Sequence, residues 1–385
     1  MLDQTEHILR QLIGFPTVSA DSNLELIHYV ASLLEDVGAK IELQHDATRK
    51  KANLFATIGP DIAGGIVLSG HSDVVPVSDQ NWRTDPFTLE KEDGRYYGRG
   101  TCDMKGFIAA TLAMAPTFAA HQLKRPIHFA FTYDEEVGCL GAQDLVQILG
   151  HRPHLPAAAI VGEPTDMKIV EGHKGCCEYS VYFEGHAGHG SMPDHGVNAA
   201  EYATRYVSKL LELREALKGR APKDSPFDPP WTTINVGRIE GGTAHNVICN
   251  HAEVDWEMRP IAQADADWVN GILQSFCQDD LLPNMRKIWP DSNITTRTIG
   301  EVIGLTPLRS NEARDIVVAL TGSNDSHFVP FGTEAGLFQE LGIATIVCGP
   351  GSIEQAHKAD EFLEIGQLKQ CLSMLDKLAH SMKAA

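Results

Sequence analysis

The order of apolar segments changes near residue 173, and this change restricts the fold more than any other feature of the chain. Before it, strand-like runs such as "GIVLSGHSDVVP" and "IHFAFTYDEE" alternate with helical patterns over residues 105–121 and 140–149. Strands that alternate with helices indicate an open, largely parallel sheet that helices cover on both faces. We therefore predict an α/β domain over residues 1–173.

The segment after residue 173 has a different order of elements. It begins with a strand and a loop, "CCEYSVYFEGHAGHGSMP", and continues with the long helical pattern "NAAEYATRYVSKLLELREAL". Two strands follow, "WTTINVGRIEGG" and "HAEVDWEMRP", and then a helix over 263–278 and a strand over 294–302. The order β-α-β-β-α-β is that of a ferredoxin-like sandwich. We predict an inserted α+β domain over residues 174–303.

The last segment, residues 304–385, is expected to return to the first domain. It contains a short apolar strand that ends in a Gly/Pro turn, "IATIVCGPG", and a final amphipathic helix, "IGQLKQCLSMLDKLAHSM". A chain of 385 residues is long enough for two domains with separate cores.

Charge and cysteine content disfavour several classes of protein. The 51 acidic and 32 basic residues give a formal net charge of −19, which would repel nucleic acid and anionic membrane surfaces. This charge is compatible with a cationic substrate, although solubility alone also explains it. We expect no signal peptide and no membrane-spanning segment. The eight cysteines include no C-x-x-C pair, which indicates reduced thiols and a cytoplasmic protein.

Histidines and carboxylates recur where apolar strands end. In "SGHSDVVP", His71 and Asp73 lie two residues apart, so that alternation places both on the same side of the chain. Similar residues follow the other apolar runs or their turns: Asp103, Glu135, Glu136, Glu163 and His357. Taken singly, such residues are often caps or turn formers. Together they fit the carboxyl ends of the strands, where sites gather in open α/β sheets.

The residue types at these strand ends form a suitable ligand set for two metal ions. Two histidines and three carboxylates, one of them shared, can hold a pair of zinc ions ~3.5–4 Å apart. Zinc suits mixed nitrogen and oxygen ligands best, and cobalt or manganese would fit the same ligands. In a continuing strand Glu135 and Glu136 would point to opposite faces, so we predict that the chain turns there.

Motifs along most of the chain resemble those of the dinuclear-zinc aminoacylase, carboxypeptidase and desuccinylase family. They occur in the family's order: "SGHSDVVP", "GRGTCDMKG", "DEEVG", "VGEPT", "GHGSMPDHGVNA", "GGTAHNVIC" and "AHKADEF". The resemblance implies a zinc-hydrolase catalytic domain over 1–173 and 304–385, with a mostly parallel sheet between helices. It also implies that the inserted domain, 174–303, serves as a lid and a dimerisation surface.

The resemblance implies a role for each metal-site residue. One zinc ion would be held by His71, Glu163 and Asp103, and the other by Glu136, His357 and the same Asp103. Asp73 would orient His71 through the other ring nitrogen. Glu135 would be the general base that takes a proton from a metal-bridging water and gives it to the leaving nitrogen. The peptide bond from Asp103 to Met104 is expected to be cis.

The inserted domain would supply further site residues. By resemblance, His189 reaches the neighbouring subunit's site and stabilises the oxyanion, while Asn246 and Arg259 bind the substrate's α-carboxylate. Without the resemblance, His189 would be a mobile surface residue, Asn246 a turn former and Arg259 the end of a solvated strand. His186 and His195 lie close enough in sequence to compete with His189 for this role.

One short stretch points to a branch of the family. "FGTEAGLF" (331–338) resembles the acetylornithine deacetylases, and Glu334 within it would pair with a cationic side chain such as that of ornithine. The alternative is that Glu334 begins a helix or supports neighbouring residues. Three functions stay open: an N-acetylornithine deacetylase, another amidase of the family acting on N-succinyl-diaminopimelate, N-acyl amino acids or dipeptides, and a metal-free binding protein.

Overall fold

The computed structural model describes residues 1–384, which form two compact units. Unit 1 comprises Met1–Gly172, Leu305–Phe328 and the segment from Thr333 onward, and unit 2 comprises His173–Gly304 and Val329–Gly332. The predicted insertion spans residues 174–303. In the described part of the chain, no helix has both the length and the apolar character needed to cross a membrane. All eight cysteines are free thiols.

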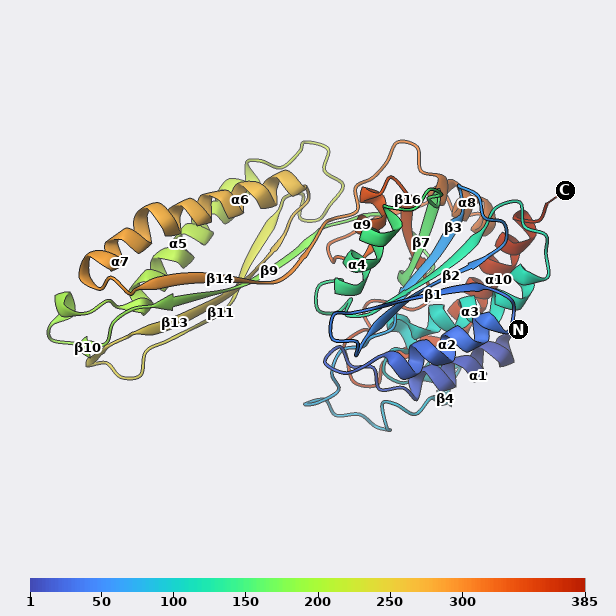
Figure 1. Ribbon diagram of the computed structural model, residues 1–385, viewed down its shortest axis with the longest axis horizontal. Coiled ribbons are helices and arrows are strands. Elements are labelled where there is room, and N and C mark those ends of the chain that lie inside the picture. Colours follow the sequence, from blue (N-terminus) through green and yellow to red (C-terminus); the bar gives the residue numbers. More distant parts are fainter. Residues whose placement is uncertain (385) are drawn as a thin grey trace. The chain divides into compact units, whose positions relative to one another are not determined.

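An eight-stranded sheet forms the centre of unit 1, in the order β1-β2-β6-β3-β7-β16-β8-β15 (Figure 1). These strands are β1 (Lys40–His45), β2 (Ala52–Ile58), β3 (Ile66–His71), β6 (Ile127–Thr132), β7 (Ala158–Pro164), β8 (Ile169–His173), β15 (Ser326–Val329) and β16 (Ala344–Gly349). The central strands β6, β3, β7 and β16 are parallel, whereas β1, β2 and β8 pair antiparallel. The predicted largely parallel sheet is confirmed at its centre, and the last segment returns to it through β16.

Helices cover both faces of this sheet. They are α1 (Leu2–Ile13), α2 (Leu24–Glu35), α3 (Gly106–Ala119), α4 (Leu140–Leu149), α8 (Glu312–Thr321), α9 (Ala335–Glu340) and α10 (Ile365–Ser381). α3 is buried on nearly every side and packs against α1 and α10, while α4 and α9 lie on the other face (Figure 1). A small sheet of β4 (Glu90–Glu92), β5 (Arg95–Tyr97) and β17 (Phe362–Glu364) completes the unit.

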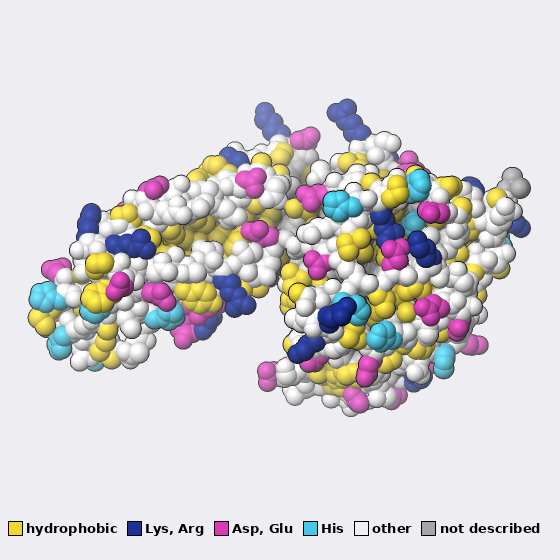
Figure 2. Space-filling view, in the orientation of Figure 1, with side chains coloured by type: hydrophobic (Ala, Val, Ile, Leu, Met, Phe, Trp, Pro, Cys, Tyr) yellow, Lys and Arg dark blue, Asp and Glu magenta, His cyan; other side chains and the backbone are white. Residues whose placement is uncertain are grey.

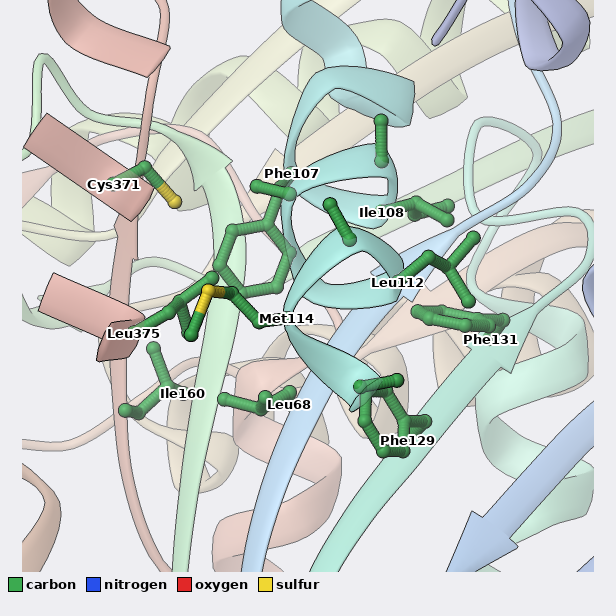
Figure 3. Packing of buried hydrophobic residues seen from close by; sticks show 14 of the residues in the cluster. Leu68, Phe107, Ile108, Leu112, Met114, Phe129, Phe131, Ile160, Cys371 and Leu375 are labelled. Carbon is green, nitrogen blue, oxygen red and sulfur yellow. The ribbon is translucent and has the colours of Figure 1, made fainter. Parts of the chain in front are cut away.

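The core of unit 1 fixes the start of α3 against the sheet. Figure 3 shows Phe107 of α3 on the side that faces Leu375 of α10, and Leu112 of α3 on the side of Phe131 in β6. Gly162 permits this close packing, because a Cβ at that position would lie 2.0 Å from the Phe107 ring. The residue that follows it in β7 is Glu163, so the same contact brings α3 next to a predicted metal ligand.

Unit 2 is an antiparallel sheet, β11-β13-β9-β14, with helices on one face. Its elements are β9 (Cys176–Glu184), β10 (Gly188–His189), α5 (Ala199–Lys218), β11 (Thr233–Gly241), β12 (Val247–Ile248), β13 (His251–Arg259), α6 (Gln263–Ser275), α7 (Leu282–Ile288) and β14 (Asn293–Val302). Alternate β9 residues such as Val181 and Phe183 are buried with Tyr206 of α5, which explains the period-two pattern. The main elements follow the predicted β-α-β-β-α-β order.

Two details of unit 2 differ from the sequence prediction. The helix expected over 263–278 ends at Ser275, where the π-helical turn Phe276–Leu281 leads into α7. The two-residue strands β10 and β12 pair with each other and were not expected. Strands this short contain too few residues to show any alternation of apolar and polar side chains.

Candidate metal centre

The predicted ligands come together at the carboxyl ends of the parallel strands. His71 is the last residue of β3, Glu163 lies near the end of β7, and Glu136 follows β6. Asp103 lies in the irregular turn Thr101–Lys105 that leads into α3, and His357 lies in the loop after β16. Because β6, β3 and β7 are parallel neighbours, their ends lie at one edge of the sheet.

Asp103 lies between the two histidines. Its Oδ1 is 2.9 Å from His71 Nε2, and its Oδ2 is 3.3 Å from His357 Nε2. Glu136 Oε2 lies 2.9 Å from His357 Nε2, and Glu163 Oε1 lies 3.8 Å from His71 Nε2. The structure thus contains two groups of three side chains that share one carboxylate. The Asp103–Met104 peptide bond is cis, as expected.

The donor set fits a pair of divalent cations. The ligand atoms of His71, Asp103 and Glu136 lie within 4.8 Å of one another, and so do those of His71, Glu135 and Glu163. Among the described residues, Glu163 Oε1 is buried without a hydrogen-bond donor. A buried carboxylate oxygen without a partner is unfavourable, and a cation at this position would satisfy it.

Burial and charge shift the pKa values of these groups strongly. Burial raises the pKa of Glu135 to about 8 and that of Glu136 to about 6, and it raises the pKa of Glu163 well above its usual range. Hydrogen bonds to Asp103 and Glu136 raise the pKa of His357 to about 10. Without a cation, the clustered acids are therefore stabilised by protons and by a charged histidine, which a bound metal ion would replace.

The paired glutamates lie in a turn, as predicted. β6 ends at Thr132, and the amide groups of Glu135 and Glu136 donate to the two carboxylate oxygens of Asp73 at 3.1 and 3.3 Å. The Ser19 hydroxyl also donates to Asp73, at 2.7 Å. The turn lets both glutamates reach the same site, and the Asp73 carboxylate fixes the backbone that carries them.

The contact between Asp73 and His71 differs in detail from the sequence prediction. His71 Nδ1 lies 2.9 Å from the backbone carbonyl oxygen of Asp73 and 3.6 Å from its carboxylate. The ring is therefore oriented mainly by the main chain of Asp73. Its carboxylate is engaged by the amide groups of the glutamate turn, which the sequence pattern did not indicate.

Glu334 is fully buried beneath the strand ends. Its two carboxylate oxygens accept hydrogen bonds from Ser69 Oγ at 2.5 Å and from Thr132 Oγ1 at 2.7 Å. Glu334 also directly precedes α9. These contacts favour the alternative in which it supports β3 and β6, because neither oxygen faces solvent.

The other candidate residues belong to unit 2. β10 and β12 bring His189 and Asn246 close together, since Gly190 N donates to the Asn246 carbonyl at 2.8 Å. The exposed ring of His189 contacts Ser191 Oγ at 2.8 Å. Arg259 donates two hydrogen bonds to Glu257, at 2.7 and 3.1 Å.

The competing histidines of unit 2 have different surroundings. The His186 ring stacks on Trp289 with 3.8 Å between centroids, and His195 lies in a short, exposed 3-10 turn. A stacked ring is less free to turn toward a ligand than the exposed His189. Glu361, a buried carboxylate that accepts hydrogen bonds from the backbone of the Asp103 turn, was not predicted from the sequence, although it lies within "AHKADEF".

Comparisons with known proteins give one family and several similar structures. The model of peptidase family M20/M25/M40 matches residues 67–381. An acetylornithine deacetylase of Shigella sonnei is 36% identical over 380 residues, which cover 97% of this chain and 96% of that protein. Among solved structures, an M20 family metallo-carboxypeptidase of Sulfolobus solfataricus has a TM-score of 0.76 at 19% identity, with 98% of each chain covered. A dinuclear metal-binding peptidase of Bacillus subtilis has a TM-score of 0.63 at 16% identity, with 98% of this chain and 97% of that chain covered.

Proposed function

The chain belongs to peptidase family M20/M25/M40, and we propose that this metal-dependent amide hydrolase is an N2-acetyl-L-ornithine deacetylase. It would hydrolyse acetylornithine to acetate and ornithine, a step of arginine biosynthesis in the cytoplasm. The observation that carries the proposal is Asp103 between His71 and His357, with Glu163 and Glu136 beside them. The acetylornithine deacetylase that is similar along nearly the whole chain supports the choice of substrate.

Two zinc ions would occupy the centre, with cobalt or manganese as possible substitutes. His71, Glu163 and Asp103 would hold one ion, and Glu136, His357 and Asp103 the other. When bound, such ions lower the pKa of a water and polarise an amide carbonyl. The third function considered above, a metal-free binding protein, is disfavoured because all five ligands and Glu135 are present and lie together.

Glu135 would move the proton during hydrolysis. It lies beside the ligand atoms of His71 and Glu163. From there its carboxylate would take a proton from the attacking water and return it to the leaving nitrogen. The Cys139 thiol donates to Glu135 Oε1 at 3.4 Å and limits where the carboxylate can turn.

Unit 2 would bind the rest of the substrate. Asn246 and Arg259 would hold the α-carboxylate, for which the planar guanidinium of Arg259 is suited. His189 of the partner subunit would donate to the carbonyl oxygen as negative charge develops on it. The half-buried Arg259 is already paired with Glu257, so a substrate carboxylate would have to compete for it.

A homodimer that forms through unit 2 would bring His189 of one subunit to the substrate carbonyl in the other. An open groove of about 370 Å³ runs between α6 and β14 and is lined by Tyr206, Trp256 and Ile294, among others. Figure 2 shows hydrophobic side chains along this groove. β14 is also an edge strand of the sheet, so its outer side is open to a second copy.

A second candidate function is hydrolysis of a related amide. The solved structures with this fold include a tripeptidase of Staphylococcus aureus, with a TM-score of 0.75 at 19% identity and 99% of each chain covered. A peptidase or a desuccinylase would use the same residues of unit 1. The two candidates therefore differ in the acyl group and the amino acid that they accept.

A substrate panel tests the proposal. Purified protein loaded with zinc is assayed for free-amine release from acetylornithine, a neutral acetyl amino acid, succinyl-diaminopimelate and a dipeptide. We expect the highest kcat/KM on acetylornithine and two metal ions per chain by elemental analysis. The Glu135→Gln protein, prepared in the same way, controls for contaminating amidases. A higher kcat/KM on another substrate would assign that substrate in place of acetylornithine. No turnover on any of these amides would reject the proposal that the protein is an amide hydrolase.

A further inference from the structure

The two ligands Asp103 and His357 lie on irregular segments of the chain. His71 and Glu163 belong to strands β3 and β7, whose backbones are fixed by ladder hydrogen bonds on both sides. Asp103 lies in a turn with non-helical φ and ψ, and His357 has a φ of 62°, which is uncommon for a residue with a side chain. These two ligands therefore need other contacts to hold them in place.

Glu361 supplies such contacts to the Asp103 turn. Its Oε1 accepts from the amide groups of Cys102 at 2.9 Å and of Asp103 at 3.1 Å. Its Oε2 accepts from the amide group of Gly100 at 3.0 Å. Glu361 has 1% exposure, so these charge-assisted bonds form away from water. One side chain thus binds two amide groups of the turn that presents Asp103 and the amide group of the residue that precedes this turn.

Arg99 links this turn to the segment that carries His357. Its Nη1 donates to Glu361 Oε2 at 2.7 Å and to the Lys358 carbonyl at 3.3 Å. Its Nη2 donates to Gln80 Oε1 at 2.6 Å, and Gln80 Nε2 in turn donates to the His357 carbonyl at 2.9 Å. Arg99 is as buried as Glu361, so this ion pair is shielded from water.

We propose that Glu361, Arg99 and Gln80 are positioning residues that hold Asp103 and His357 in place for the metal ion shared by Asp103, Glu136 and His357. This inference rests on the dinuclear centre proposed above. Two of that ion's three ligands lie on segments that the network fixes, compared with one of three for the ion held by His71, Glu163 and Asp103. Loss of the network therefore weakens binding of the ion held by Asp103, Glu136 and His357 more than binding of the other ion.

Glu361→Gln tests this by metal titration. The variant keeps the size of the side chain but places an NH2 group against backbone N–H donors. Metal-free protein is titrated with Co²⁺ by calorimetry and by its visible absorption. We expect wild type to bind two ions, and we expect Glu361→Gln to bind one of them about 10- to 100-fold less tightly. The affinity for the other ion, which has only Asp103 on the segments that the network holds, should fall by clearly less.

Glu364→Gln is the matched control. Glu364 lies three residues further along, and its ion pair with Arg95, 3.3 Å long, is exposed. This variant removes the same charge from the same segment without touching the network. Its two affinities should match those of wild type, and its far-UV circular dichroism should show the same fold.

Gln80→Ala keeps the test decisive if Glu361→Gln does not fold. It leaves the Arg99–Glu361 pair intact and removes the donor to the His357 carbonyl together with the oxygen that accepts from Arg99 Nη2 and Trp82 Nε1. It should therefore also weaken binding of the ion held by Asp103, Glu136 and His357. Equal weakening of both ions, or no weakening in either variant, overturns the positioning role. A wild-type chain that binds fewer than two ions overturns the dinuclear centre as well, which separates the two failures.

Discussion

The candidate residues of unit 1 and unit 2 differ in how the fold holds them. In unit 1, His71, Asp103 and Glu163 are buried and contact one another, and hydrogen bonds from their own unit fix their backbones. In unit 2, His189 and Asn246 are exposed on a two-stranded ribbon. In unit 1 the fold alone brings the candidate residues together, whereas we expect the exposed residues of unit 2 to form a site only with a substrate or another subunit.

The two adjacent glutamates of unit 1, Glu135 and Glu136, should have different roles. We expect Glu135→Gln to lower kcat by about 10³- to 10⁴-fold while two metal ions remain bound, because proton transfer is lost and the ligands are not. Glu136→Gln should instead lose one metal ion. Glu136 lies 2.9 Å from His357, and both would be ligands of the same ion. Steady-state kinetics and elemental analysis of both variants provide the measurements. A Glu135→Gln protein with stoichiometric zinc and intact turnover would remove Glu135 from the mechanism.

The unit 2 residues should affect turnover without affecting metal binding. We expect His189→Ala to lower kcat by about 10²- to 10³-fold, as when an oxyanion donor is removed, with both ions retained. Because His189 lies in a different unit from the ligands, its loss leaves their contacts unchanged. Metal analysis together with steady-state kinetics shows whether turnover falls while the metal content stays unchanged. Ser191→Ala, which removes the hydroxyl 2.8 Å from the His189 ring, is the milder comparison variant.

A mixed dimer shows in which subunit His189 acts. Glu135→Gln and His189→Ala chains are co-expressed with different tags and tested together. If His189 serves the neighbouring site, random pairing restores about a quarter of wild-type activity, because half of the dimers are hybrids with one intact site each. If it serves its own chain, every hybrid site lacks one group and activity stays at the level of the single variants.

Removal of the metal ions should make the pH dependence of unit 1 visible. Burial raises the pKa of Glu136 to about 6 and that of Glu163 well above its usual range, so these two groups bind more protons in the folded metal-free protein than in the unfolded chain. The contribution of these groups to stability is therefore full at acidic pH and is lost as the pH rises through the raised values. A metal ion has to displace those protons, so its affinity increases with pH.

Calorimetry with Co²⁺ at pH 6 and pH 8 measures this effect. We expect binding to be on the order of tenfold tighter or more at pH 8, with protons released into the buffer. The increase in melting temperature on metal addition should likewise be larger at pH 8. Equal affinity at both values would mean that the ligands are already deprotonated, against the pKa directions in the metal-free site.

The sequence predicted those parts of the site that follow from regular elements. His71 and Glu163 end apolar strands, so period-two patterns were enough to place them at one sheet edge. Glu361 was missed because its partners are backbone amide groups, one of them 258 residues earlier in the chain, and such contacts leave no spacing pattern. The role of the Asp73 carboxylate was missed for the same reason, since it binds the amide groups of the glutamate turn. β10 and β12 are too short to have a pattern of their own.

Glu334 gives the smallest expected effect and tests whether a buried carboxylate of unit 1 contacts substrate at all. Because Ser69 and Thr132 occupy both of its oxygens, Glu334→Gln should cost about 1–3 kcal/mol of stability through an imperfectly paired buried group. The values of kcat/KM on acetylornithine and on a neutral acetyl amino acid should fall together and by less than tenfold. Glu340→Gln, at the exposed end of the same helix α9, should change neither quantity. A loss confined to acetylornithine would mean that the Glu334 side chain turns away from Ser69 and Thr132 to meet the ornithine ammonium. In that case, burial in unit 1 would not distinguish residues that support the site from residues that bind substrate.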